Sequence, residues 1–470
     1  MPCLVFFTIH NTTRWWKYLG SRIDFADVTV LSDLRGDGDR SLVDDFYRFM
    51  AKGDAAAVAI ARFGDEGCAD IILRCRVLRS LDHGLALRLI GAMTQAIELA
   101  FDDLDPDLVL TFTIDRYVMD VMARTARARG IDFLEMTTSI IPDEVMLMRR
   151  GKPAWLREPS RETVEAAVNM LCKADFAPVY VRDARRFSTR QFWSVFGYYA
   201  LRGALFNVWR FLKGDRFNIH YLDALKRLKH KVRIADVRVL KLLDPNWQSR
   251  LGEAPRERRV FLGLQLFPEA SMDYWLESPA MLAHDDVLVR YCEVLDAAGY
   301  RIFVKDHPLQ FGFRQRELFE RLSKLPSVTL VPYDVPANLM IEKCGISLTF
   351  TGTIGFQAAL AGLCSITTDP YYAAENDGTE SYFIHVRDVD EIGGLVDRLK
   401  RWRPPDDLDA ARRGIMRHLA SISVEGDYFG WRKFDPEDQA AREAVEPLAR
   451  SLNAYLPKFL KSRKTAASSS

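Results

Sequence analysis

The chain has 470 residues and a mass of 53.7 kDa, too large for one ordinary hydrophobic core, so we expect two domains. A net charge of +1 with 27% charged residues excludes a general electrostatic attraction to nucleic acid. The seven cysteines are scattered without a CxxC pair, which indicates buried thiols in a reducing compartment. The N-terminal text lacks the pattern of a secretory signal, and no run approaches about 18 uncharged apolar residues. We therefore predict a cytoplasmic protein without a membrane span.

Strand and helix signals alternate over residues 1–150. The runs CLVFFTI and ADVTVLSD predict short strands, and residues 85–104 carry apolar side chains at helical spacing. A third strand is entered through Pro106 and ends at Asp115; a helix closed by Gly130 and the strand IDFLEMTTS follow. This βαβ succession predicts a parallel, Rossmann-like sheet.

Residues 151–255 have a different composition, rich in aromatic and basic side chains, and predict a helical connecting region. Within 187–213, four aromatic residues are spaced to share one helix face: Phe192, Phe196, Tyr199 and Phe206. Four basic residues lie among them: Arg190, Arg202, Arg210 and Lys213. We expect the aromatic side chains to pack inward in helices that bridge the domains. The alternative is an interfacial helix on an anionic membrane surface.

Residues 256–430 predict a second Rossmann-like domain, and 431–470 a helix that returns to the first domain, followed by a polar tail. The segment DVDEIGGLVDRLKRW reads as a helix. The central stretch 301–366 reads as a strand, a His-Pro turn, a second strand and a Gly/Thr turn that opens a helix. Polar residues that follow parallel strands gather at the carboxyl edge of the sheet, where open α/β sheets bind ligands.

Two groups of residues at that edge suggest a phosphate site. His307 supplies a titratable cation beside Lys305, and Pro308 stiffens the turn. Thr351, Gly352 and Thr353 lie where a helix N-terminus offers N–H groups to a phosphate. Together they predict a pocket for a nucleotide monophosphate or diphosphate.

Three segments in this half carry a resemblance: LQLFPEASMDYW, FVKDHP and TFTGTIGFQAALAG. They resemble segments of bacterial capsular and surface polysaccharide biosynthesis glycosyltransferases of the GT-B type. Those proteins carry a Pro-Glu-Ala motif, a Lys-x-His-Pro motif and a Gly-Thr-x-Gly-x-x-Ala helix start in this order. The resemblance covers about 120 residues of the C-terminal half and hardly touches the first 250.

The resemblance implies a donor-binding C-terminal domain and an acceptor-binding N-terminal domain. Glu269 would then hydrogen-bond the ribose or donor sugar, the alternative being an acid that only favours a helix N-terminus. His307 would stabilise the leaving nucleotide. Gln265, Gln357 and Asp369 are further candidates for contact with the donor or nucleotide.

The general base for the acceptor should be a carboxylate of the first domain. Asp115 follows a strand and is the first candidate, with Glu135 and the Asp143-Glu144 pair as rivals. The triplets at 37–39, 105–107 and 388–390 match the Asp-x-Asp pattern of metal-dependent glycosyltransferases, but such triplets are frequent in proteins and none joins a recognisable Mg²⁺-diphosphate site. We therefore expect no metal and no cofactor besides the nucleotide-sugar. The sequence contains no Walker A, GxGxxG, HExxH or GxSxG motif.

These features predict an inverting, metal-independent glycosyltransferase. It would move a sugar from a CMP-linked ulosonic acid or a UDP-sugar to a growing surface or capsular polysaccharide. A glycan or lipid-linked acceptor is the expected second substrate, and 187–213 is a candidate for peripheral contact with the inner face of the membrane. The alternatives are a glycerophosphotransferase or a sugar-nucleotide 2-epimerase of the same fold, or a non-catalytic polysaccharide-assembly module.

Overall fold

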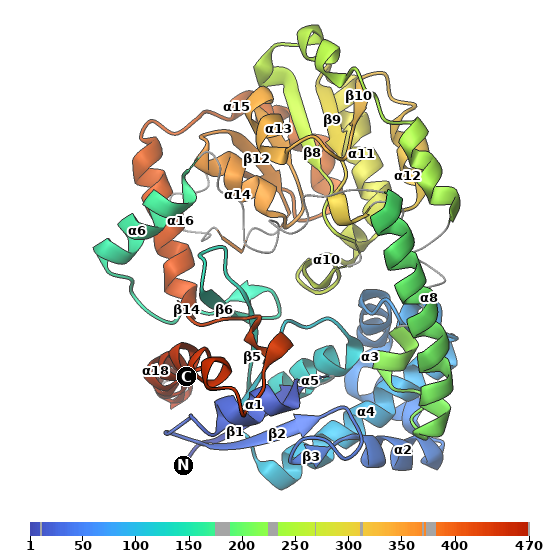
Figure 1. Cartoon of the computed structure of the whole chain (residues 1–470), viewed down its shortest axis with the longest axis vertical. Coiled ribbons are helices and arrows are strands. Elements are labelled where there is room, and N and C mark those ends of the chain that lie inside the picture. The colour runs from blue at the N-terminus through green and yellow to red at the C-terminus, as the bar shows by residue number, and fades with distance from the viewer. Residues whose placement is uncertain are drawn as a thin grey trace. The chain divides into compact units, whose positions relative to one another are not determined.

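The computed structural model describes residues 1–9, 12–173, 189–223, 234–267, 269–310, 314–368, 371–372 and 382–468. Two compact units are present (Figure 1). Unit 1 comprises Met1–Pro159, Leu205–Asp223 and Ala420–Ser470, and unit 2 comprises Ser160–Ala204 and Ala224–Leu419. The segments of the two units therefore alternate along the chain. Two of the four divisions fall inside helices, namely α8 (Thr189–Leu212) and α16 (Leu408–Ile422).

Unit 1 contains an eight-stranded sheet in the order β14-β6-β5-β4-β1-β2-β3, with β7 paired to β6. Its strands are β1 (Cys3–Thr8), β2 (Asp27–Ser32), β3 (Arg40–Ser41), β4 (Leu108–Phe112), β5 (Asp132–Thr138), β6 (Glu144–Arg149), β7 (Lys152–Pro153) and β14 (Ser423–Glu425). The five strands from β3 to β5 are parallel, whereas β6, β7 and β14 pair antiparallel. The order of the parallel strands along the chain is 3-2-1-4-5, which is a Rossmann-like arrangement and confirms the prediction.

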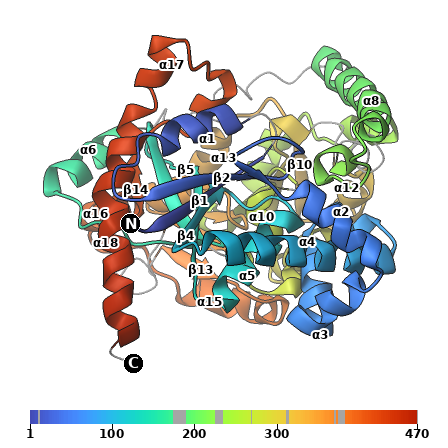
Figure 2. The same cartoon turned by 90° about the horizontal axis from the view of Figure 1, so that it is seen from below.

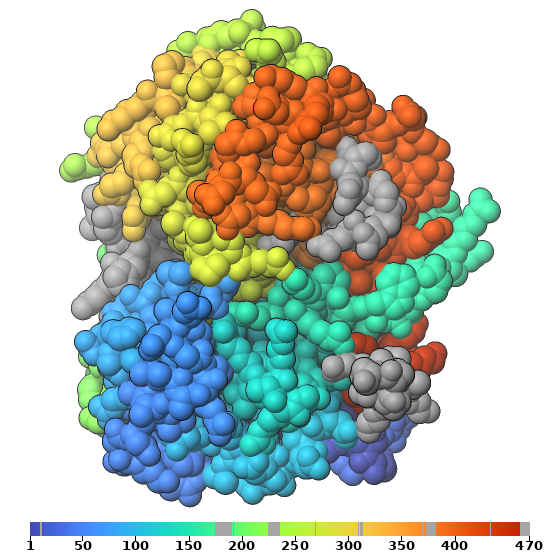
Figure 3. Space-filling view, turned by 180° about the vertical axis from the view of Figure 1, so that it is seen from behind, coloured from blue at the N-terminus to red at the C-terminus, as the bar shows by residue number. Residues whose placement is uncertain are grey.

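The helices of unit 1 are α1 (Thr13–Gly20), α2 (Val43–Lys52), α3 (Ala55–Arg74), α4 (His83–Leu104), α5 (Tyr117–Ala128), α17 (Gln439–Glu443) and α18 (Glu446–Ser468). Among the described residues, α4 alone is long and apolar enough to cross a membrane, yet 67% of its apolar window is buried. It contacts α2, α3 and α5, and the outer side of α3 forms part of the surface in Figure 3 (blue). Helix α4 is therefore a core helix of unit 1.

The C-terminal helix α18 lies beside β14 and belongs to unit 1 (Figures 1 and 2). Arg22 of unit 1 forms an ion pair with Glu446 at 3.0 Å, and Asn453 accepts a hydrogen bond from the N–H of Asp24 at 3.1 Å. Helix α18 thus belongs to a unit whose strands, apart from β14, come from the first 153 residues.

Unit 2 contains a six-stranded, entirely parallel sheet in the order β10-β9-β8-β11-β12-β13. The strands are β8 (Arg259–Gly263), β9 (Arg301–Lys305), β10 (Val328–Val331), β11 (Ile346–Leu348), β12 (Cys364–Thr367) and β13 (Phe383–His385). Numbered along the chain, this order is 3-2-1-4-5-6, the order of dinucleotide-binding sheets. The second Rossmann-like domain is therefore confirmed as well.

The helices within unit 2 include α6 (Arg161–Leu171), α10 (Ala270–Tyr274), α11 (His284–Ala297), α12 (Arg316–Leu322), α13 (Ala337–Lys343), α14 (Thr353–Leu360) and α15 (Leu395–Arg401). Of these, α11, α13 and α14 pack directly against the sheet, whose strands are buried. The helix expected over 388–402 is shorter than predicted, because Val389–Gly394 forms a 3₁₀ turn before α15 begins. The pair Gly393-Gly394 favours that break, since glycine is a poor helix former.

Candidate functional site

The strand order of unit 2 places a topological switch point between β8 and β11. These two strands are neighbours in the sheet, but the chain continues from them toward opposite edges. In open α/β sheets, ligands bind outside the carboxyl ends of the strands at such a switch point. Gln265 lies two residues after β8, and the turn 349–353 follows β11. Gln265 and residues 351–353 of this turn are candidates from the sequence.

The side-chain amide of Gln265 joins the two strand ends. Its Oε1 accepts hydrogen bonds from the N–H of Thr351 at 2.8 Å and the N–H of Phe350 at 3.1 Å. Its Nε2 donates to Thr351 Oγ1 at 2.9 Å. Gln265 and Thr351 are both buried, so an amide that satisfies three partners here is a rigid connection. Gln265 therefore positions the turn rather than projecting into open space.

Gly352 is the N-cap residue of α14, and no side chain caps the helix at this position. A Cβ on Gly352 would lie 2.6 Å from Thr349 Oγ1 and 3.0 Å from Gln265 Cγ, so only glycine fits. The first N–H groups of a helix have no partner within the helix and carry a partial positive charge. Thr353 opens α14 and, like Gly352, is partly exposed. The start of α14 from Gly352 onward can therefore present backbone N–H groups to an anion, whereas the N–H and hydroxyl of Thr351 are already bonded to Gln265.

The His-Pro turn is held by Asp306, the residue that precedes His307. The buried Asp306 carboxylate accepts hydrogen bonds from the His307 N–H at 2.8 Å, Tyr333 Oη at 2.9 Å and Arg314 Nε at 2.9 Å. Arg314 also donates through Nη2 to the backbone oxygen of Gln265. One hydrogen-bonded network therefore connects the His-Pro turn to the end of β8.

Arg314 is a functional candidate that the sequence did not reveal. It is buried, and its Nη1 has no hydrogen-bond partner among the described residues. The local sequence does not distinguish Arg314 from the other arginines of the segment. Its place at the site follows from its ion pair with Asp306, which the sequence does not reveal. Such a guanidinium favours an anion in its neighbourhood.

The charge of His307 differs from the expectation. The pKa of His307 is lowered to about 4, mainly by burial; the nearby Lys305 and Arg314 cations act in the same direction and Asp306 opposes them. His307 is therefore neutral at pH 7 and acts as a hydrogen-bonding group rather than the predicted cation. Burial also lowers the pKa of Lys305, whose Nζ donates to the backbone oxygen of Asp306 at 3.3 Å.

The remaining candidates of unit 2 lie in the sequence a few residues after the strands or the turn described above. Glu269 is the N-cap residue of α10, where Met272 and Asp273 donate their N–H groups to its backbone oxygen. Its carboxylate accepts a hydrogen bond from Ser271 Oγ at 3.4 Å, an arrangement that suits the helix N-terminus. Gln357 is partly exposed one turn beyond Thr353. Asp369 lies outside the described residues.

Unit 1 has its own switch point between β1 and β4, and Asp115 follows β4 there. Asp115 is half-buried, with 28% of its side chain exposed, and both carboxylate oxygens contact guanidinium groups. Arg116 Nε lies 2.8 Å from Oδ1, and Arg76 Nη2 lies 3.5 Å from Oδ2. An acceptor hydroxyl would compete with these groups for the carboxylate.

Asp33 is a second carboxylate at this edge that the sequence interpretation missed. It follows β2, and Arg116 Nη1 lies 3.7 Å from its Oδ2. Asp33 is only 4% exposed, and burial raises its pKa to about 6 against the opposing effect of Arg116. The run ADVTVLSD does end in this residue, so the rule that selected Asp115 would also have selected Asp33.

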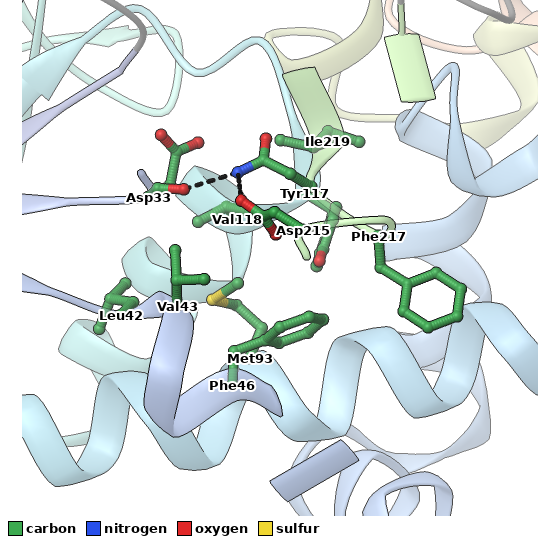
Figure 4. Close-up of a pocket in the computed structure, with 11 residues that line it drawn as sticks. Asp33, Leu42, Val43, Phe46, Met93, Tyr117, Val118, Asp215, Phe217 and Ile219 are labelled. Atoms are coloured by element: carbon green, nitrogen blue, oxygen red, sulfur yellow. Dashed lines mark hydrogen bonds between the residues drawn. The ribbon is translucent and has the colours of Figure 1, made fainter. Parts of the chain in front are cut away.

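Asp33 lines a pocket within unit 1 (Figure 4). Asn218 Nδ2 donates to the Asp33 backbone oxygen at 2.7 Å and to Asp215 Oδ2 at 3.0 Å. Apolar side chains, among them Val43, Phe46 and Met93, line the opposite side. The pocket measures about 290 Å³ including the open solvent at its mouth, but water-sized molecules have only about 20 Å³ available. It can therefore hold a water molecule but not a sugar.

The other candidates for the general base are Glu135, Asp143 and Glu144, and their contacts and burial suggest structural roles. The buried Glu135 accepts hydrogen bonds from the N–H groups of Ile114 at 2.8 Å and Gly151 at 2.6 Å, and burial raises its pKa to about 7. Burial likewise raises the pKa of Glu144 to about 7, although Arg157 lies 3.4 Å away. Asp143 is exposed in a turn with positive φ. Within the described ranges, no three His, Cys, Asp or Glu side chains are grouped to hold a metal ion.

No protein-family model and no curated protein matches this chain. Solved structures with a similar arrangement include the UDP-GlcNAc 2-epimerase from Methanocaldococcus jannaschii, at 13% identity over 88% of this chain and 98% of that chain, with a TM-score of 0.27. Another is the beta Kdo 2,4 transferase KpsC from Thermosulfurimonas dismutans, at 12% identity over 72% of this chain and 87% of that chain, with a TM-score of 0.31. A third is Os79 from O. sativa in complex with UDP and deoxynivalenol-3-glucoside, at 13% identity, 95% and 99% coverage and a TM-score of 0.25. At these scores the likeness assigns neither substrate nor activity.

We expect Asp33 to make the stability of the chain depend on pH. Its pKa of about 6 lies above the ordinary value of 3.8, so between these values the folded chain binds more protons than the unfolded chain. The free energy of unfolding therefore falls as the pH rises from about 4 to 6, and above that range Asp33 costs about 3 kcal/mol. The free energy of unfolding of Asp33→Asn minus that of the wild type, measured with urea, should therefore be about 2 kcal/mol larger at pH 8 than at pH 4.5.

The matched control is Asp143→Asn, because Asp143 is exposed in a turn of the same unit. Its difference from the wild type should be the same at both pH values. An Asp33→Asn difference that does not change with pH would contradict the burial of an Asp33 carboxylate that prefers to be protonated.

Proposed function

We propose that this chain is an inverting, metal-independent glycosyltransferase of GT-B type that uses a nucleotide-sugar donor. The observation that carries the proposal is the hydrogen bonding at the switch point of unit 2, where Gln265 fixes the turn that precedes the N-terminus of α14. A sugar donor must lose a nucleotide whose phosphate gains negative charge, and fixed N–H groups stabilise that charge at little reorganisation cost. Unit 2 would therefore bind the donor.

Three further groups support a phosphate at this edge. Arg314 Nη1 is a buried donor without a hydrogen-bond partner among the described residues, and Lys305 is a second buried cation in the same unit. His307 is held by Asp306 and, being neutral, would donate or accept one hydrogen bond at the leaving phosphate. A bound phosphate would itself favour the charged form of His307.

The acceptor would bind unit 1, where Asp115 is the partly exposed carboxylate at the switch point. Its proposed role is to take the proton from the acceptor hydroxyl while the sugar transfers. Arg116 holds Asp115 on one side and approaches the buried Asp33 on the other. Asp33 would thus act by positioning Arg116 rather than by contact with the acceptor.

The donor is proposed to be a CMP-linked ulosonic acid or a UDP-sugar, and the product a surface or capsular polysaccharide made in the bacterial cytoplasm. A sugar-nucleotide 2-epimerase or a glycerophosphotransferase is the second candidate, because the same switch-point site would serve a nucleotide-linked substrate in either. A non-catalytic assembly module would keep the fold and the nucleotide but not the reaction.

A nucleotide screen followed by turnover tests this proposal. In a thermal-shift assay with CMP, CDP, UDP and GDP, at least one nucleotide should raise the melting temperature, because binding to the folded state stabilises it. Donor turnover should require an oligosaccharide or lipid-linked acceptor and should persist in EDTA. Turnover without an acceptor would favour the epimerase, and loss in EDTA restored by Mg²⁺ would contradict metal independence.

The switch-point site can be tested by a single methyl group. In Gly352→Ala the added Cβ would meet Thr349 Oγ1 and Gln265, so the turn must shift and its N–H groups lose their aim. We expect nucleotide affinity, measured by calorimetry, to fall about 10-fold or more, equivalent to at least about 1.4 kcal/mol. Gly393→Ala is the matched control in the same unit, because nothing lies within 4 Å of its added Cβ. Equal affinity for the two variants would exclude the turn as the phosphate site.

The proposed role of His307 predicts a graded response. His307→Ala should fold normally and lower turnover by about 100-fold, because a hydrogen bond to the leaving phosphate is lost. His307→Gln, which keeps a neutral donor, should lose less. The wild-type kcat/KM, which reports the free enzyme, should show no loss from His307 deprotonation between pH 6 and 8, since the pKa of His307 without ligand lies near 4. Near wild-type turnover of His307→Ala would remove His307 from the site.

A further inference from the structure

Helix α8 carries two apolar faces rather than one (green in Figures 1 and 2). The predicted aromatic face does pack inward at both ends. Phe192 is only 2% exposed and belongs to the core of unit 2, where Phe196 packs against it. Phe206 contacts the rings of His220 and Tyr221 within unit 1. Residues 187 and 188 lie outside the described part of the chain.

The opposite face is apolar as well, and it is exposed. Four residues spaced at i, i+4, i+7 and i+11 form what we call the outer stripe: Leu201, Leu205, Val208 and Leu212. Their exposed fractions are 64%, 55%, 58% and 73%, respectively. Of the 14 large hydrophobic residues exposed in the described part of the chain, eight lie on α8. Such a concentration marks an interaction surface rather than ordinary scattered exposure.

Exposed aromatic residues flank the outer stripe: Trp193, Tyr198, Trp209 and Phe211. Basic groups lie over three of these rings. Arg202 is 6.0 Å from the centre of the Tyr198 ring, Lys213 is 5.8 Å from Trp209, and Arg210 is 4.8 Å from Phe211. Tryptophan and tyrosine, with an apolar body and a polar tip, favour the boundary between water and lipid.

The charges of the helix all have one sign. Residues 189–214 contain three arginines and one lysine but no aspartate or glutamate. Two copies of α8 packed through the outer stripe would bring only basic side chains together, which disfavours a homodimer. An anionic surface is the complementary occupant. Because α8 is not among the described helices apolar enough to span a membrane, it would lie on that surface.

We propose that the outer stripe of α8 docks the enzyme on an anionic lipid bilayer. The leucine and valine side chains enter the boundary between headgroups and acyl chains. The flanking basic groups, Arg202 and Lys213 among them, contact lipid phosphates. This proposal is independent of the proposed transfer reaction, because it concerns only the exposed face of one helix.

Flotation of the full-length protein with vesicles tests the docking. Vesicles of phosphatidylcholine with one-third phosphatidylglycerol should carry the protein at about 0.05 M salt and release most of it at about 0.5 M, because the Debye length shrinks. Vesicles of phosphatidylcholine alone should carry at least 10-fold less. The double variant Leu205→Glu/Leu212→Glu should lose flotation, and Arg202→Glu/Lys213→Glu should weaken it at low salt.

The matched control is Ile60→Glu, because Ile60 is an exposed apolar residue of another helix, α3, and does not belong to the outer stripe. It should float like the wild type, and circular dichroism should confirm that every variant is folded. Absence of wild-type flotation, or flotation that survives Leu205→Glu/Leu212→Glu, would overturn the proposal. So would a dimer in analytical ultracentrifugation that this double variant converts to monomer, because a second copy would then cover the stripe.

Discussion

The amide of Gln265 is the interaction on which the candidate nucleotide site depends. Parallel strands place their carboxyl ends at one edge of the sheet, but the chain leaves β8 and β11 toward opposite sides. The loops that follow these two strands are therefore joined only if side chains bridge them. Gln265 supplies it with one acceptor that binds two backbone N–H groups and one donor that binds Thr351. Gly352 can then stand within contact distance of the same side chain, and α14 begins with its N–H groups aimed outward.

The same edge illustrates how burial changes the chemistry of a motif. His307 and Lys305 suggest a cationic pair, yet burial disfavours charge on both, and the pKa of each is lowered. Asp306 and Arg314 form the buried ion pair instead, at 2.9 Å. This group contains three basic side chains and one carboxylate. A ligand phosphate would supply the negative charge that balances the basic side chains.

Unit 1 has the opposite imbalance at its own switch point. Four carboxylates lie there with two guanidinium groups: Asp33, Asp115, Asp215 and Asp223 with Arg76 and Arg116. Burial raises the pKa of Asp33 and of Asp215, so protons can offset part of the excess negative charge. The two units thus present edges of unlike character, one suited to an anion and one to a hydroxyl or a proton.

The sequence alone determined the fold class and named several residues that lie at the switch point of unit 2. Strand runs such as DPDLVLTFTID are apolar because parallel strands are buried on both faces, and the residues after each run must reach the sheet edge. Gln265, Thr351 and Gly352 were therefore predictable. Only the tertiary structure brought in Arg314, since its contact with Asp306 spans a segment without a distinctive pattern. It also decided the neutral state of His307 and the outward direction of the Leu201–Leu212 stripe, because burial depends on neighbours that helical spacing cannot reveal.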